Sequence, residues 1–197
     1  MKRLEEFILE KLKISKVETI YRPKSKEELI DIINKEIEVK GSNCSLNHIN
    51  VSNIDDMSDL FNHSDFNGDI SEWDVSNVRS MSYMFNNSKF NGDISNWDVS
   101  SVTDMHRMFA ESKFNGDISN WDVSKVKDMF GMFYGSKFNG DISNWDVSSV
   151  EDMGYMFAYS KFNGDISDWN VSKVTNTECV FMGSKFTGNI SKWYKKY

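Results

Sequence analysis

A unit of 24 residues recurs six times along this chain without insertion or deletion, and this period constrains the fold more than any other feature. One phenylalanine per unit, from Phe66 to Phe186, recurs at this spacing of 24 residues. Fixed self-similarity is typical of a stacked array, in which each unit buries its apolar face against its neighbours. The tryptophans lie 24 residues apart, at Trp73, Trp97, Trp121, Trp145, Trp169 and Trp193.

A single unit, residues 94–117, combines two hydrophobic periods. Residues 94–99 are rich in β-forming side chains, whereas the apolar residues of 102–109 recur every three to four positions. The second spacing predicts two helical turns, with Ser100 as the N-cap. Asn115-Gly116 then predicts a tight turn that returns the chain to the next strand.

A coil of this length with one strand and one helix has the size of a leucine-rich-repeat turn. We therefore expect an α/β solenoid: a leucine-rich-repeat-like stack of short parallel strands and short helices with a helical N-terminal cap. Residues 1–45 are assigned to the cap, residues 46–193 to six repeats, and residues 194–197 to a basic and aromatic C-terminal tail.

The segment before the repeats predicts two amphipathic helices. Ser25 and Glu28, shortly after Pro23, are spaced as a capping box at the start of the second helix. The apolar faces of the two helices are Leu4, Ile8 and Leu12, and Leu29, Ile33 and Ile37.

The repeated motif also resembles a known family. The string Trp-Asp-Val-Ser-x-Val-x-x-Met-x-x-Met-Phe-x-x-Ser-x-Phe-Asn-Gly-Asp-Ile-Ser is similar to the mycoplasma-type tandem repeat of the BspA-like leucine-rich-repeat surface proteins, over residues 46–193. The resemblance implies the solenoid architecture and a general role in protein contact. Many members of that family are secreted or lipid-anchored and are implicated in adhesion, whereas this N-terminus does not read as a signal sequence.

Composition narrows the classes of partner. Hydrophobic residues make up 39% of the chain and aromatic residues 14%, too many for a disordered protein, and the apolar runs are too short to cross a bilayer. The net charge of −7 disfavours nucleic acid as a partner, because that binding depends on clustered Lys and Arg. Charged residues interrupt any apolar stretch near Met1, so a complete chain is expected to be cytoplasmic and not membrane-bound.

Aspartates recur in two columns, and two interpretations of them stay open. Stacked carboxylates could hold calcium, or each Asp could accept backbone N–H bonds within its own turn, which we favour. A parallel column of lysines could neutralise their charge. The aspartate columns are Asp69, Asp93, Asp117, Asp141 and Asp165, and Asp74, Asp98, Asp122 and Asp146; the lysine column is Lys89, Lys113, Lys137, Lys161 and Lys185.

No constellation in the sequence indicates catalysis. His48, His63 and His106 lie in different columns without cysteines at metal-ligand spacing, so neither a metal nor a cofactor is expected. Cys44 and Cys179 fall several repeats apart and are predicted to be free thiols. Catalysis needs unlike groups that converge on one point, whereas a repeat spreads like groups along a line. We expect a protein that is not an enzyme.

Positions that the repeat leaves free are the best candidates for a binding surface. Internal identity marks packing, so a bulky aromatic residue at a free position is not required by the core. Exposed aromatics beside an arginine are typical interface anchors, although the rings could instead pack against one another. The predicted partner-binding residues are Arg107, Phe130, Tyr134, Tyr155 and Tyr159.

These observations favour a non-enzymatic protein–protein interaction module. Two alternatives remain. One is an acidic inhibitor, of phage or mobile-element type, that blocks a basic surface of a host nucleic-acid-binding protein. The other is a cell-surface adhesin-type binding protein.

Overall fold

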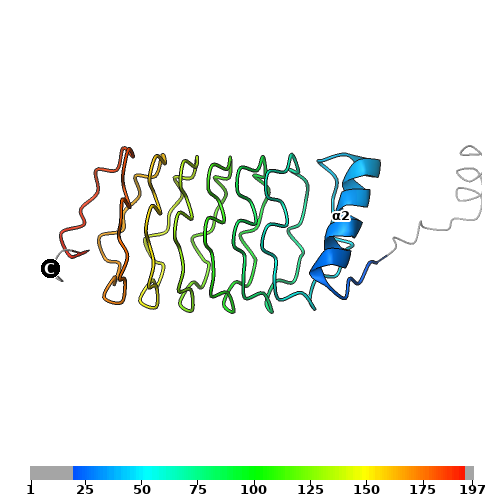
Figure 1. Ribbon diagram of the computed structural model, residues 1–197, viewed down its shortest axis with the longest axis horizontal. Helices are drawn as coiled ribbons and strands as arrows, with labels where there is room; N and C mark the ends of the chain where they lie inside the picture. Colours follow the sequence, from blue (N-terminus) through cyan, green and yellow to red (C-terminus); the bar gives the residue numbers. More distant parts are fainter. Residues whose placement is uncertain (1–19, 194–197) are drawn as a thin grey trace, which may run out of the picture.

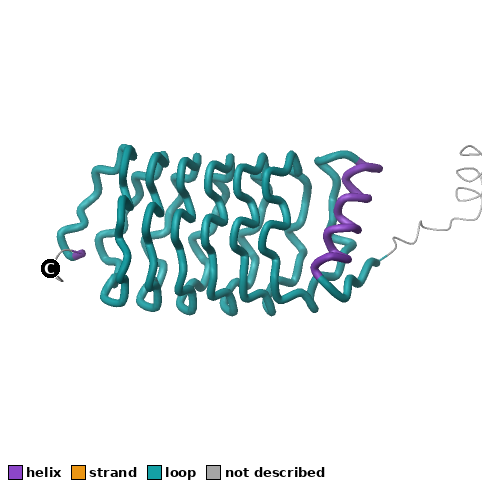
Figure 2. Tube along the Cα trace, in the orientation of Figure 1, coloured by secondary structure: helices purple, strands orange, loops and turns teal. Residues whose placement is uncertain are grey.

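The structure of the chain is a computed structural model that describes residues 20–193. Successive coils of the chain lie side by side in sequence order along the long axis of the molecule, and a helix packs at the N-terminal end of the described coils (Figure 1). Apart from this helix, the coils are built of turns and loops (Figure 2). The first helix predicted for the cap, with Leu4, Ile8 and Leu12, and the tail at 194–197 lie outside the described residues.

The described helix, α2, spans Lys26–Lys40 and matches the second helix predicted for the cap. Ser25 is its N-cap and accepts a hydrogen bond from the N–H of Glu28, as predicted. The Glu28 carboxylate accepts from the N–H of Lys24, one residue before the partner that a strict capping box would use. Leu29 and Ile33 are buried against the first coil.

Adjacent coils are joined by parallel bridges between residues 24 positions apart. Beyond the cap, these bridges involve single residues, and no longer strand occurs within residues 20–193. The register therefore equals the repeat length, so equivalent residues of successive coils form columns along the stack. The bridged pairs of the main column are Asp56–Ser80, Ser80–Asp104, Asp104–Asp128, Asp128–Asp152 and Asp152–Asn176.

The segment expected to be helical in each repeat is instead a chain of overlapping turns, so the short-helix part of our prediction is wrong for these residues. In the unit that begins at Ile94, alternate N–H groups close turns to the carbonyl three residues earlier: Met108 to Met105, Ala110 to Arg107, and Ser112 to Phe109. The other N–H groups bond to the next coil: Met105 to Asp128, Arg107 to Phe130, Phe109 to Met132, and Glu111 to Tyr134. We call this segment, residues 105–112 here and its equivalent in each other coil, the turn ribbon.

Two features explain why turns replace the helix. Arg107 and Glu111 have φ of 51° and 54°, so every fourth residue is left-handed and an α-helix cannot continue through it. A neighbouring coil on each side satisfies the backbone groups that a helix would pair internally. Turns that repeat every four residues produce nearly the same apolar spacing as a helix, which accounts for the misleading pattern.

The β-rich part of each repeat also forms turns. The N–H of Trp97 bonds to the carbonyl of Ile94, and the N–H of Val102 bonds to that of Val99. Ser100 lies in this second turn and is not an N-cap, because no helix follows it.

The core runs unbroken along the stack and consists of the repeated columns. Each tryptophan from Trp73 to Trp169 donates its indole N–H to a carbonyl 27 residues earlier, in the preceding coil. Trp73 and Trp97 stack with ring centroids 6.5 Å apart and planes 4° from parallel. Met129 is fully buried. The tryptophan column predicted from the 24-residue step is therefore confirmed.

An acid and its partners join α2 to the first coil. Glu36 is buried, and its Oε2 lies 3.0 Å from Nε2 of His48 and also contacts the ammonium of Lys40. Burial alone would raise the pKa of the Glu36 carboxyl, but the hydrogen bond and charge of Lys40 and the charge of His48 lower it below its ordinary value. Farther along the contact, Lys26 pairs with Asp56 at 3.1 Å.

Candidate partner-binding surface

All five residues predicted to bind a partner lie on the turn ribbons of neighbouring coils and contact one another. The guanidinium carbon of Arg107 lies 5.6 Å from the ring centroid of Phe130 and 5.5 Å from that of Tyr134, so the cation sits between two aromatic faces. Phe130 reaches the Tyr155 ring at 5.5 Å, and Tyr134 meets the Tyr159 ring edge-on at 5.7 Å. We call these five residues the aromatic surface.

The rings of the aromatic surface pack on one another and still remain accessible. Phe130, Tyr134 and Tyr155 are partly exposed, and Tyr159 is 52% exposed. Met182, which accepts the N–H of Tyr159 at its carbonyl, is 38% exposed and extends the apolar area to the last coil. The rings do pack against one another, as the alternative interpretation of the sequence expected, but this packing does not bury them.

Three members of the aromatic surface adopt a backbone conformation that favours glycine. Arg107, Tyr155 and Tyr159 have φ of 51°, 55° and 56°. In the coil between them, the equivalent positions are Gly131 and Gly135, with φ of 59° and 60°. Large side chains in the left-handed region are uncommon and strained. Since this chain can place glycine in these columns, the bulky residues are not there to satisfy the backbone.

Small residues in the following coil make room for the rings. A Cβ added at Gly154 would lie 3.0 Å from the Phe130 ring, and one added at Gly183 would lie 2.5 Å from the Tyr159 ring. Each of these aromatic side chains therefore leans over a glycine of the next coil. The alternation of large and small residues holds the rings side by side along the stack.

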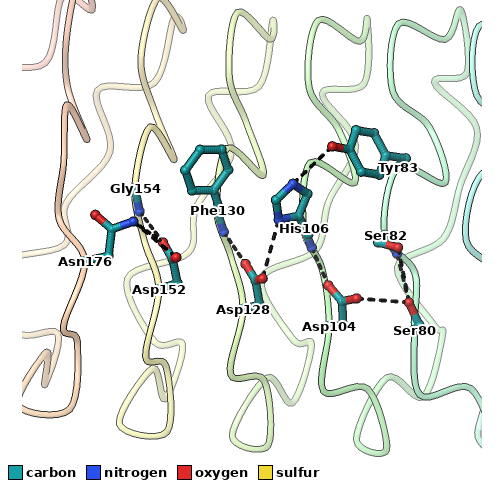
Figure 3. Close-up of polar contacts among 10 residues, drawn as sticks. All are labelled: Ser80, Ser82, Tyr83, Asp104, His106, Asp128, Phe130, Asp152, Gly154 and Asn176. Carbon is teal, nitrogen blue, oxygen red and sulfur yellow. Dashed lines mark hydrogen bonds and ion pairs between the residues drawn. The ribbon is translucent and has the colours of Figure 1, made fainter.

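A column of carboxylates passes beside Phe130 of the aromatic surface (Figure 3). Asp104, Asp128 and Asp152 each accept the backbone N–H of the residue two positions later, at 2.8–2.9 Å. These bonds lock the start of each turn ribbon. Asn176 continues the column and donates its side-chain amide to both oxygens of Asp152.

A hydrogen-bonded relay orients the histidine beside Phe130. Tyr83 Oη lies 3.2 Å from Nε2 of His106, and the other ring nitrogen lies 3.4 Å from Oδ2 of Asp128 (Figure 3). The His106 ring stacks on Phe130 with centroids 5.0 Å apart and planes 8° from parallel. Burial alone would raise the pKa of Asp128, but hydrogen bonds from His106 and from the N–H of Phe130 lower it.

At the C-terminal side of the aromatic surface, the hydroxyl of Tyr155 donates to Oε1 of Glu178 at 3.1 Å. Interactions with Cys179 and then Glu178 raise the pKa of Tyr155 to about 12. The phenol therefore stays protonated at neutral pH and can donate to a partner or to Glu178.

Sequence reasoning missed His106, Met182 and the carboxylate column. His106 occupies the same column as Phe130, and this equivalence was the signal that could have included it. The carboxylate column of Asp104, Asp128 and Asp152 was overlooked because a helix was expected there, and at a helix start these residues would cap separate units. As parts of a turn ribbon they form one continuous row.

The aspartates singled out in the sequence serve their own turns. Asp117 accepts the N–H of Ser119 at 2.9 Å, and Asp122 accepts that of Ser124 at 3.0 Å, so the preferred interpretation of these columns is confirmed. The lysine column does not neutralise them, since within the described residues Lys89 pairs with Asp65 instead.

Within residues 20–193, no group of three or more His, Cys, Asp or Glu side chains could hold a metal ion. Cys44 and Cys179 are both free thiols.

Comparison with known proteins finds one family. A family model described as "Mycoplasma protein of unknown function, DUF285" matches residues 33–137 and, a second time, residues 112–196. No curated protein matches the chain, and no solved structure does. Nor does any helix within residues 20–193 have the length and apolar character of a membrane span.

Proposed function

This chain belongs to the mycoplasma repeat family DUF285, whose function is unknown, and we propose that it is a non-enzymatic protein-interaction module that binds its partner through the aromatic surface. We also propose that its stacked coils are a leucine-rich-repeat-like solenoid of the BspA-like kind, in which turn ribbons stand where the short helices were expected. The repeated motif and the 24-residue register of the bridges support this class.

The observation that carries the proposal is the cost of the aromatic surface to the free chain. Tyr155 and Tyr159 occupy left-handed positions where Gly131 and Gly135 stand one coil earlier. Tyr159 also exposes about half of its surface to water. Backbone strain together with exposed apolar area is expected where a partner later covers the residues. Aromatic residues and arginine are also the side chains that most often dominate binding energy.

The relay of Tyr83, His106 and Asp128 is the closest approach to catalytic geometry on this surface. Its geometry is accounted for by packing, because it fixes the His106 ring flat against Phe130. Elsewhere the repeat presents like groups in rows, which does not favour catalysis. We therefore propose a binding role and not an enzymatic one.

The carboxylate column favours a second candidate function, in which the partner is a basic protein. Asp104, Asp128 and Asp152 form a row that passes Phe130 of the aromatic surface (Figure 3), in a chain of net charge −7. A protein that presents basic side chains would complement this row. The acidic inhibitor of a basic protein surface is therefore the runner-up function.

The test compares proteins captured by the wild-type chain and by the double variant Tyr155→Gly/Tyr159→Gly. Glycine suits the backbone at both positions, so the variant should fold while losing two rings. The matched control is His63→Gly, an exposed ring with φ of 55° in the same column as Tyr159 but outside the aromatic surface and its histidine relay.

Partners that bind the aromatic surface should be retained by the control and lost by the double variant. Once a partner is purified, the double variant should weaken its binding by at least about 2 kcal/mol, roughly 30-fold. Equal binding by the double variant and the wild type would move the site to another face.

A further inference from the structure

A second face of each coil carries three rows of polar side chains. In the segment that follows the turn ribbon, Phe114 and Ile118 are buried, whereas Lys113, Asn115 and Asp117 are exposed. The same alternation recurs in successive coils, so the exposed residues form parallel rows along the stack. The lysine row is Lys89, Lys113, Lys137, Lys161 and Lys185; the asparagine row is Asn67, Asn91, Asn115, Asn139 and Asn163; the aspartate row is Asp69, Asp93, Asp117, Asp141 and Asp165. We call these rows the polar strip.

The asparagine row is a hydrogen-bonded ladder with a fixed orientation. Oδ1 of Asn91 accepts the backbone N–H of Asn115, and Oδ1 of Asn115 accepts that of Asn139, both at 2.7 Å. Because the oxygen faces the next coil, the position of Nδ2 in each amide is also set. Within residues 20–193, the Nδ2 groups of this row have no acceptor. The ladder therefore presents one oriented N–H₂ donor per coil.

The lysine row is a line of positive charges, most of which have no paired carboxylate in the part of the chain that the structure describes. Lys89 pairs with Asp65 at 2.7 Å. Among the described residues, Lys113, Lys137, Lys161 and Lys185 have no ion-pair partner. The aspartate of the same coil lies four residues along an extended segment, about 13 Å away, and is hydrogen-bonded in its own turn. Like charges recur at about 4.8 Å from coil to coil.

We propose that the polar strip binds a linear anionic polysaccharide laid along the stack. Each coil offers an ammonium and an adjacent amide donor for a carboxylate or sulfate group, and an aspartate that can accept from sugar hydroxyls. The strip holds no aromatic side chain on which a nucleobase could stack. Carboxylates of the aspartate row can accept from the many hydroxyls of a sugar polymer, whereas the sugar-phosphate backbone of DNA offers no such donors, which favours a polysaccharide over DNA.

The experiment measures binding of the whole chain to four probes by isothermal titration at low and physiological salt. Polygalacturonate carries carboxylates alone, heparin carries sulfates as well as carboxylates, dextran is neutral, and a single-stranded oligothymidylate is a nucleic acid of comparable length. Binding of polygalacturonate or heparin, without dextran, is the expected result, and the stronger of the two identifies the anionic group. No binding of either, or tighter binding of the oligothymidylate, would overturn the proposal.

Two sets of variants test the strip itself. Asn115→Asp/Asn139→Asp keeps the oxygen that accepts the ladder bond but removes the donors, and should weaken binding at least 10-fold. Its charge-matched control, Asn120→Asp/Asn144→Asp, changes exposed residues outside the strip and should alter binding less than twofold.

The lysines are tested in the same way. Lys113→Gln/Lys137→Gln/Lys161→Gln should lose at least 10-fold in affinity, whereas Lys125→Gln/Lys127→Gln/Lys173→Gln, which removes three lysines outside the strip, should not. An equal loss in both triple variants would show diffuse charge attraction and refute a built strip. Binding should persist in Tyr155→Gly/Tyr159→Gly, so the strip is tested independently of the aromatic surface.

Discussion

At the scale of single residues, the columns of the turn ribbon show what each position requires. Left-handed positions hold residues as different as Arg107, Gly131 and Tyr155 in successive coils, with φ between 51° and 59°. The backbone conformation is therefore imposed by stacking and not by the residue itself. The fold requires only a residue that tolerates a positive φ, which glycine does best. Contact with a partner requires a large side chain at the same position.

A direct prediction concerns Tyr155. Both Tyr155→Ala and Tyr155→Gly remove the ring, but alanine keeps the left-handed strain, whereas glycine relieves it. We expect the glycine variant to be more stable than the alanine variant by about 1 kcal/mol, even though glycine is normally the less stable of the two. Urea unfolding of both variants measures the difference. Greater stability of the alanine variant would show that Tyr155 is not left-handed in solution.

Met129 tests the core at the same scale. Its side chain is fully buried between neighbouring coils in the middle of the stack. Met129→Asp places a charge there without a partner and should lower the free energy of unfolding by several kcal/mol. Thermal unfolding followed by circular dichroism measures the loss, with the exposed Lys127→Asp as the control. An unchanged melting temperature is incompatible with a core position.

At the scale of elements, some features were predictable from the sequence and others were not. The cap helix α2 could be located because Ser25, Glu28 and its apolar spacing are local signals. The turn ribbon could not be distinguished from a helix by hydrophobic spacing alone, since turns every four residues repeat almost as a helix does. The recurrence of glycine four residues apart, at Gly131 and Gly135, was the available signal against a helix.

The same distinction applies to the aromatic surface. Its five members could be predicted because they interrupt the repeat, which needs no knowledge of their geometry. The partners of each ring could not be predicted, because a helix and a turn ribbon bring different residues together. The contact of Arg107 with both Phe130 and Tyr134 depends on its left-handed backbone, which directs the side chain over Gly131 in the next coil.

The junction of α2 with the first coil should respond to acid. The folded-state pKa of Glu36 is lowered, so its ionised form stabilises the fold at pH values above its ordinary pKa. This stabilisation is lost as the pH falls through the lowered folded value. Glu36→Gln should destabilise the chain by about 1–3 kcal/mol at pH 7, and the difference in stability from wild type should shrink as the pH falls below about 5 and through the lowered folded pKa.

Urea unfolding at several pH values measures the gap between wild type and Glu36→Gln. Glu38→Gln, on the exposed side of the same helix, is the control and should leave stability nearly unchanged at every pH. A gap that stays constant from pH 7 to pH 3 would mean that the charge of Glu36 does not stabilise the junction.

At the scale of the whole molecule, each coil contacts only its neighbours, so the stack should tolerate the loss of an entire unit. Deleting residues 118–141 joins Asp117 to Ile142, which reproduces the Asp117–Ile118 junction of the intact chain. All columns then keep their register. We expect this variant to unfold cooperatively, with a smaller dependence on urea because less surface is exposed on unfolding.

The position of the deleted coil separates folding from binding. Residues 118–141 include Phe130 and Tyr134, so their deletion should leave a folded stack that no longer binds through the aromatic surface. Deleting residues 70–93 also removes one unit in register but retains all five residues of that surface, and should preserve both folding and partner binding.

Deleting only residues 118–129 shifts every later column by half a coil and places polar residues against the core, so this chain should not fold. Circular dichroism and urea unfolding of the three variants distinguish these outcomes. A folded product from the half-coil deletion would contradict a fold whose register is set by the 24-residue unit.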